Sequence, residues 1–199
     1  ALVVVALAGC HVHRDVNATN LFVTYEGEVK IIDFGLAKAA NRVSRTAAGI
    51  IKGKAAYMSP EQTMGQPLDP RTDVFALGIT LWEIAVDRRL FKQDDDVETL
   101  KRVHAAVVPD PTQLIAGFPE SLWQVLKKAL ARDRNERFAN AGEFARALDA
   151  FVLETGRATG PQAIAKAMNS LFAKERADFE AWFTQASSAR QPVALPTLK

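Results

Sequence analysis

The fold is decided by the polar stretch His13-Arg14-Asp15-Val16-Asn17-Ala18-Thr19-Asn20, near the start of a chain of 199 residues. Two short runs rich in β-branched and aromatic residues follow it, at residues 21–25 and 29–32. Gly27 stands between them, where a tight turn favours a residue that tolerates a positive φ. This pattern predicts a small β-hairpin directly after the polar stretch.

Polar residues stand at both outer ends of the predicted hairpin. Asn20 precedes its first strand, and Asp33-Phe34-Gly35 begins thirteen residues after Asn20, at the end of its second strand. Because the two ends of a hairpin lie next to each other, we expect Asn20 and Asp33 to reach one site. In isolation, an Asp and an Asn at such places would be interpreted as surface residues that cap turns.

A third motif, Ser59-Pro60-Glu61, follows a long segment rich in Gly, Ala, Ser and Thr at residues 35–56. Together the three motifs resemble those of the protein kinases: the catalytic loop H-R-D-x-K-x-x-N, the metal-binding D-F-G and the A-P-E that closes the activation segment. The resemblance covers about residues 1–152 and is stronger to bacterial eukaryotic-like serine/threonine protein kinases than to typical eukaryotic ones. It implies the protein kinase-like fold, of class α+β, as a mostly α-helical C-terminal lobe with a small β-hairpin at the active site.

The resemblance also implies a reaction, the transfer of a phosphoryl group from ATP to Ser or Thr of a protein substrate. Phosphoryl transfer needs an aligned hydroxyl group and cations around the phosphate. By resemblance, Asp15 accepts or orients the proton of the substrate hydroxyl, and Asn20 and Asp33 supply oxygen ligands to Mg²⁺. Phe22 matches a residue that lies under the adenine ring of ATP, and packing in the core would explain it equally well.

Further residues of the kinase pattern are implied to support this site. They are His13, Arg14, Phe34, Gly35, Glu61, Asp73 and Arg137. By resemblance, His13 and Phe34 stack in an apolar column, and Asp73 accepts backbone hydrogen bonds from the catalytic loop. Glu61 and Arg137 match a buried ion pair beneath the substrate platform.

Two positions depart from the kinase pattern. Asn17 stands where most kinases have Lys, and Lys54 stands where serine/threonine kinases have the Thr that contacts this Lys. Our hypothesis is that Lys54 is catalytic and supplies the missing ammonium group from the other side. The alternative is an exposed Lys that is merely tolerated there.

The activation segment contains candidate phosphorylation sites. Arg14 precedes the predicted catalytic Asp15, as in kinases that are switched on by phosphorylation of this segment. Thr46 is the preferred candidate and Ser44 the second. The alternative is that neither is modified.

The elements that hold most of the ATP in protein kinases have no match in this sequence. Only twelve residues precede His13, and no G-x-G-x-x-G occurs. We therefore expect the isolated chain to bind ATP weakly, to be inactive, and to expose apolar surface where a small lobe would dock. The alternative function is a pseudokinase or truncated lobe that acts as a protein-interaction module.

The first residues allow a different interpretation, because Leu7-Ala8-Gly9-Cys10 resembles a lipoprotein cleavage box. No Met and no basic segment precede it, so we prefer the end of a buried helix in a chain that is a fragment or truncated. The apolar run is too short to cross a membrane, and the single Cys10 suits a reducing, cytoplasmic location. A net charge of +2 gives no support for a nucleic-acid partner, and the oligomeric state stays open.

The remainder predicts helices separated by prolines. The helix from Arg71 is apolar nearly all round and is expected in the middle of the lobe. Other helices are predicted at about residues 97–107, 120–131 and 141–153, and the acidic run at 94–96 is interpreted as a solvated helix cap. A linker is expected at residues 153–161, a tail helix at 162–185 and a disordered tail at 186–199.

Overall fold

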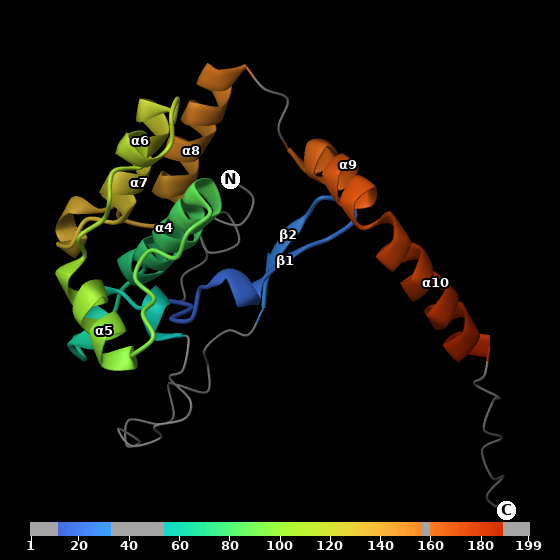
Figure 1. Cartoon of the computed structure of the whole chain (residues 1–199), viewed down its shortest axis with the longest axis horizontal. Helices are drawn as coiled ribbons and strands as arrows, with labels where there is room; N and C mark the ends of the chain where they lie inside the picture. The colour runs from blue at the N-terminus through green and yellow to red at the C-terminus, as the bar shows by residue number, and fades with distance from the viewer. Residues whose placement is uncertain (1–11, 33–53, 157–159, 189–199) are drawn as a thin grey trace, which may run out of the picture. The chain divides into compact units, whose positions relative to one another are not determined.

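The computed structural model describes residues 12–32, 54–156 and 160–188 (Figure 1). These residues form two compact units. The first unit contains residues 12–22, 29–32 and 54–156, and the second contains residues 23–28 and 160–188. Helices dominate both units, and the strands that are described make a two-stranded sheet.

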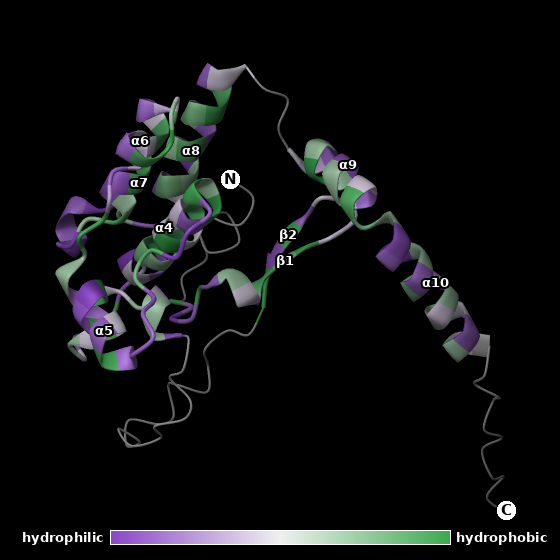
Figure 2. Cartoon of the chain, viewed as in Figure 1, coloured by the Kyte–Doolittle hydropathy of each residue, from purple (hydrophilic) through white to green (hydrophobic). Residues whose placement is uncertain are grey.

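The centre of the first unit is helix α4, Arg71–Val86. Its residues are apolar nearly all round, so it buries opposite faces in two clusters. Val74 and Leu77 pack with Phe144 in one cluster, whereas Phe75 packs in the other. Hydrophobic colours run along α4 in Figure 2. The prediction of a helix in the middle of the lobe is therefore confirmed.

Amphipathic helices cover α4. They are α5 at Asp96–Ala105, α7 at Glu120–Ala129 and α8 at Ala141–Thr155, with the short α3 at Pro60–Thr63 and α6 at Pro111–Leu114. Among them, α5 and α8 begin with a side-chain cap. The Asp95 carboxylate accepts a hydrogen bond from the backbone of Glu98, which confirms the acidic run as a helix cap. Asn140 caps α8 in the same way.

The predicted hairpin is present and shorter than expected. After the 3₁₀ turn η1 at Ala18–Asn20, strand β1 covers Leu21–Val23 and strand β2 covers Val29–Ile31. Gly27 has a φ of 82°, in the left-handed region that a turn requires there. At the open end, the backbone N–H of Ile32 donates to the carbonyl oxygen of Asn20 at 3.0 Å. This register places Asn20 opposite the residue that precedes Asp33.

The second unit joins the tip of the hairpin to helices α9, Pro161–Leu171, and α10, Ala173–Ser188. The side-chain amide of Asn169 donates to the carbonyl oxygen of Tyr25 at 2.9 Å. The Arg176 guanidinium lies 5.3 Å from the centre of the Tyr25 ring and also donates to the Asn169 side chain. These contacts connect residues that are far apart in the sequence.

Three predicted boundaries of the tail are wrong. The single helix expected at residues 162–185 is broken at Phe172, whose φ of −121° and ψ of 30° are not helical. Arg176, just past the break, contacts Asn169 and the Tyr25 ring, and such tertiary contacts override a continuous helical pattern. Helix α8 continues to Thr155, so the linker expected from residue 153 begins later, after Gly156 with its φ of 60°. Residues 186–188 belong to α10 rather than to a disordered tail.

Within the described ranges, no helix combines the length and the apolar composition that crossing a membrane requires.

Candidate active site

The carboxylate of Asp15 is held by residues from two segments. The Lys54 ammonium lies 2.6 Å from its Oδ2 atom, and the amide nitrogen of Asn17 lies 3.3 Å from its Oδ1 atom. The amide nitrogen of Asn20 donates to the Asp15 carbonyl oxygen at 2.7 Å. The Asp15 side chain is 10% exposed, so it is shielded and still reachable from solvent. The structure thus brings together Asp15 and Asn20 of the catalytic-loop motif with Lys54, which was predicted from a separate segment.

Asp73, at the start of α4, fixes the backbone of the loop that carries Asp15. Its two carboxylate oxygens accept from the backbone N–H groups of His13 at 2.7 Å and Arg14 at 2.9 Å. The predicted contact is therefore present. Burial raises the pKa of Asp73, and the two backbone hydrogen bonds oppose that rise. Arg14 has a φ of 68°, a conformation that costs energy in a non-glycine residue and is kept here by these bonds.

His13 connects the same loop to the hairpin. Its side chain is buried, and its Nε2 atom lies 3.2 Å from the carbonyl oxygen of Ile32. Ile32 in turn pairs with Asn20 through the backbone. The loop, the open end of the hairpin and α4 are therefore one hydrogen-bonded assembly.

Asn17 has a structural role that the motif comparison missed. Its Oδ1 atom accepts from the backbone N–H of Thr19 at 3.0 Å and from the Thr19 hydroxyl, so it caps η1. Its Nδ2 atom donates to the Asp15 carbonyl oxygen at 3.0 Å. The signal in the sequence is Asn-x-Thr before a turn, the composition of an Asx cap.

Lys54 is attached to α4 through the residues that follow it. Ala55 and Ala56 are buried in the 3₁₀ turn η2, Ala55–Tyr57. The Tyr57 hydroxyl donates to Glu83 of α4 at 2.7 Å, and Arg89 contacts both groups. Burial and the neighbouring Glu83 carboxylate raise the pKa of Tyr57 to about 12, so this phenol stays protonated at neutral pH.

The predicted ion pair of Glu61 and Arg137 is present and buried. Its two hydrogen bonds measure 2.8 and 3.0 Å, and the Arg137 side chain is 0% exposed. Burial favours the neutral carboxyl group, but the hydrogen bonds and charge of Arg137 outweigh it and lower the pKa of Glu61. The pair fixes α3 to the loop that precedes α8.

Other predicted residues lie elsewhere or outside the described ranges. Phe22 on β1 is 51% exposed, which excludes the interpretation that it packs in the core. Val23 and Ile32 of the hairpin are also exposed, as expected if a small lobe covers this region. The residues outside the described ranges are Asp33, Phe34, Gly35, Ser44 and Thr46, together with Cys10 and the apolar start.

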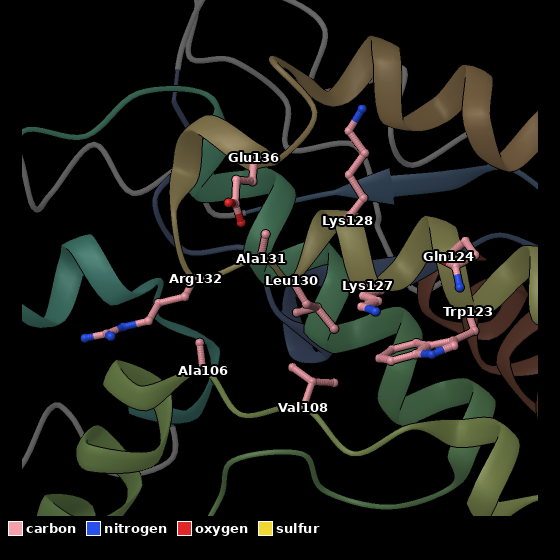
Figure 3. Close-up of a pocket in the computed structure, with 10 residues that line it drawn as sticks. All are labelled: Ala106, Val108, Trp123, Gln124, Lys127, Lys128, Leu130, Ala131, Arg132 and Glu136. Carbon is pink, nitrogen blue, oxygen red and sulfur yellow. The ribbon is translucent and has the colours of Figure 1, made fainter.

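The first unit also contains a cavity of about 460 Å³ that is not lined by Asp15 or Lys54. It lies between the end of α5 and α7, over Trp123 and Leu130 (Figure 3). In Figure 3 the Lys128 side chain points away from Val108, and its ammonium lies 4.6 Å from the centre of the Phe138 ring. A smaller hollow is lined by Asp15, Lys54 and Tyr57 among others, and it therefore includes two of the predicted site residues.

Comparison with known proteins identifies the family of the chain. Residues 3–148 match the family profile described as protein kinase domain. The chain is 38% identical over 83% of its length to MasK of Myxococcus xanthus, named a tyrosine-protein kinase. It is 37% identical over 66% of its length to a probable serine/threonine-protein kinase of Clostridium acetobutylicum, and 36% identical over 68% to serine/threonine-protein kinase PknL of Mycobacterium tuberculosis.

The chain spans 26%, 20% and 35% of the lengths of these three bacterial relatives. The matched residues contain the catalytic-loop motif, the hairpin and the helices around α4. On these grounds the chain belongs to the protein kinase family and has the mostly helical fold of its C-terminal lobe.

Proposed function

We propose that this chain provides the C-terminal lobe of a bacterial serine/threonine protein kinase, which transfers the γ-phosphoryl group of ATP to hydroxyl groups of protein substrates. The observation that carries the proposal is the arrangement of Asp15 beside Asn20 at the open end of the hairpin. A carboxylate next to a metal-binding amide is what an aligned phosphoryl transfer requires.

The donor atoms suit magnesium. The Nδ2 atom of Asn20 is used by the Asp15 carbonyl, which directs the amide oxygen of Asn20 elsewhere as a ligand. Asp33 follows Ile32, the backbone partner of Asn20, in the sequence, and we propose that Asn20 and Asp33 supply one amide and one carboxylate oxygen to a single ion. Mg²⁺ takes such oxygens together with phosphate and water, and when bound it neutralises charge on the phosphates of ATP.

Asp15 then acts on the substrate. The bond from the γ-phosphorus to the oxygen of ADP breaks as a bond to the substrate oxygen forms, and the hydroxyl proton passes to Asp15. Tyr57 and Met58 line the same hollow as Asp15 and would support the protein substrate. Phe22, exposed on β1, remains our candidate for contact with adenine. Thr46, with Ser44 second, remains our candidate for regulatory phosphorylation, through pairing with Arg14.

The choice of Ser and Thr over Tyr is part of the proposal, because one relative is named a tyrosine kinase and two are named serine/threonine kinases. We also propose a cytoplasmic location, where ATP and Mg²⁺ are available.

The test uses protein expressed from the complete coding sequence, with radiolabelled ATP and peptides that differ only in Ser, Thr or Tyr at one position. We expect transfer to Ser or Thr, and a loss of at least about 10²-fold in kcat for Asp15→Asn, as for removal of a general base. Asn20→Ala should raise the Mg²⁺ concentration needed for half-maximal rate. The matched control is Asp149→Asn on the exposed side of α8. Equal activities of Asp15→Asn and Asp149→Asn would refute the proposed function.

A further inference from the structure

We propose that Lys54 supplies the cation beside the catalytic carboxylate, so that the charge acting on the transferred phosphate comes from the substrate-binding segment rather than from the catalytic loop. This inference rests on the proposed kinase function and names a catalytic residue for it.

The position of the ammonium group is the first argument. It lies 2.6 Å from Oδ2 of Asp15, the group that faces the incoming hydroxyl in the proposed reaction. The Lys54 side chain is 38% exposed, whereas that of Asp15 is 10% exposed. Lys54 is therefore the more solvent-accessible partner in the hollow that both residues line. An ammonium has three N–H donors, so it can hold a carboxylate and a phosphate oxygen together.

Stability does not account for this pair. A partly exposed ion pair contributes about 0–1 kcal/mol to folding. The pair therefore calls for a task other than stability. Phosphoryl transfer provides one, because negative charge gathers on the transferred oxygens and a fixed cation stabilises it.

The catalytic loop has no cation to offer from position 17. Asn17 is buried, its oxygen caps η1 through Thr19, and its nitrogen donates to Asp15. One carboxylate oxygen of Asp15 thus faces Asn17 from its own loop, and the other faces Lys54 from across the site. The two side chains hold Asp15 from opposite sides, and only the one at position 54 is charged.

The position of the Lys54 ammonium group depends on the packing of residues 54–57 against α4. Ala55 and Ala56 are buried directly after it, and Tyr57 is hydrogen-bonded to Glu83 on the central helix. The ammonium group is therefore placed when residues 54–57 are seated against α4. In this arrangement, the same packing forms the proposed surface for the protein substrate and positions the Lys54 cation near the phosphate.

The experiment measures kcat and KM of protein from the complete coding sequence. Lys54→Met should lower kcat by about 10²–10³-fold, the effect of removing one preorganised donor to transition-state charge, with little change in KM for the peptide. Lys54→Arg keeps a cation at this position and should therefore keep most of the native kcat. Lys101→Met on α5 is the matched control, because Lys101 also pairs with a carboxylate, Glu98, at an exposed site. It should leave kcat unchanged.

A relocated cation provides a second measurement. The double variant Asn17→Lys with Lys54→Thr should be at least tenfold more active than Lys54→Thr alone, although Asn17→Lys removes the cap of η1 and lowers the melting temperature. If Lys54→Met keeps kcat within twofold of the native value, or if the double variant is no better than Lys54→Thr, the inference is wrong. If Asp15→Asn still abolishes activity in the same assay, either result would refute only the role of Lys54 and not the proposed kinase function.

Discussion

Arg137 is the residue whose removal should damage the fold most. Its guanidinium has five N–H donors, and all five are used: two by Glu61, and one each by the carbonyl oxygens of Arg71, Ala131 and Arg132. It also lies 4.6 Å from the centre of the Phe75 ring. Arg137→Met keeps much of the volume and removes every one of these hydrogen bonds.

The expected cost follows from what remains behind. The side chain of Glu61 is only 4% exposed, so Arg137→Met leaves a buried carboxylate without its guanidinium. Breaking one side of such a pair typically costs about 3–5 kcal/mol. Domains of this size are stable by about 5–15 kcal/mol, so the loss is about a fifth of the total or more. Glu61→Leu should cost a similar amount, because it leaves the buried cation.

The assay is a double-mutant cycle on the 199-residue chain, followed by urea unfolding with fluorescence and circular dichroism. We expect the double variant to be only as unstable as either single variant, which gives a coupling energy of about 3 kcal/mol. The matched pair is Lys92 and Asp96, an exposed i,i+4 contact of 3.3 Å, whose coupling should be about 0.3–0.5 kcal/mol. Equal couplings in the two cycles would refute the argument from burial.

Three further predictions concern single sites. Because its folded pKa is below the ordinary value of 4.5, Glu61 stabilises the fold above that pH and loses this contribution as the pH falls; Glu61→Gln should flatten the acid limb of a stability–pH curve. Asp73→Asn leaves one of two backbone N–H groups without an acceptor and should cost about 1–3 kcal/mol by urea unfolding. Gly27→Ala places a Cβ against the carbonyl oxygen of Pro161 and should speed hydrogen exchange in α9, whereas Gly65→Ala, also at positive φ but in open space, should not. These predictions would be contradicted by an unchanged stability–pH curve for Glu61→Gln, by unchanged stability of Asp73→Asn, and by unchanged hydrogen exchange in Gly27→Ala, respectively.

The sequence was most informative where a local pattern alone specifies the structure. The turn at Gly27 and the β-rich runs on both sides of it predicted the hairpin, and the apolar run from Arg71 predicted the buried helix. Caps such as Asp95 were visible because a helix start needs a side-chain acceptor within three residues. The pairing of Glu61 with Arg137, 76 residues apart, came from resemblance to a family, since no local rule connects them.

Other features could not be predicted, because they depend on contacts between distant segments. The helix is broken at Phe172, next to Arg176, which contacts Tyr25 at the tip of the hairpin. The amphipathic pattern of α9 and α10 alone predicts one continuous helix. The cap made by Asn17 was overlooked because comparison with a motif treats that position as a missing Lys rather than as an Asx turn.

By itself the sequence determined the order of the motifs, the hairpin and the burial of α4, because turn chemistry and apolar periodicity act over a few residues. Only the tertiary structure decided that the ammonium group of Lys54 meets the carboxylate of Asp15, 39 positions away. That contact depends on how η2 is seated through Tyr57 on α4, and packing of this kind is a property of the folded lobe rather than of any one segment.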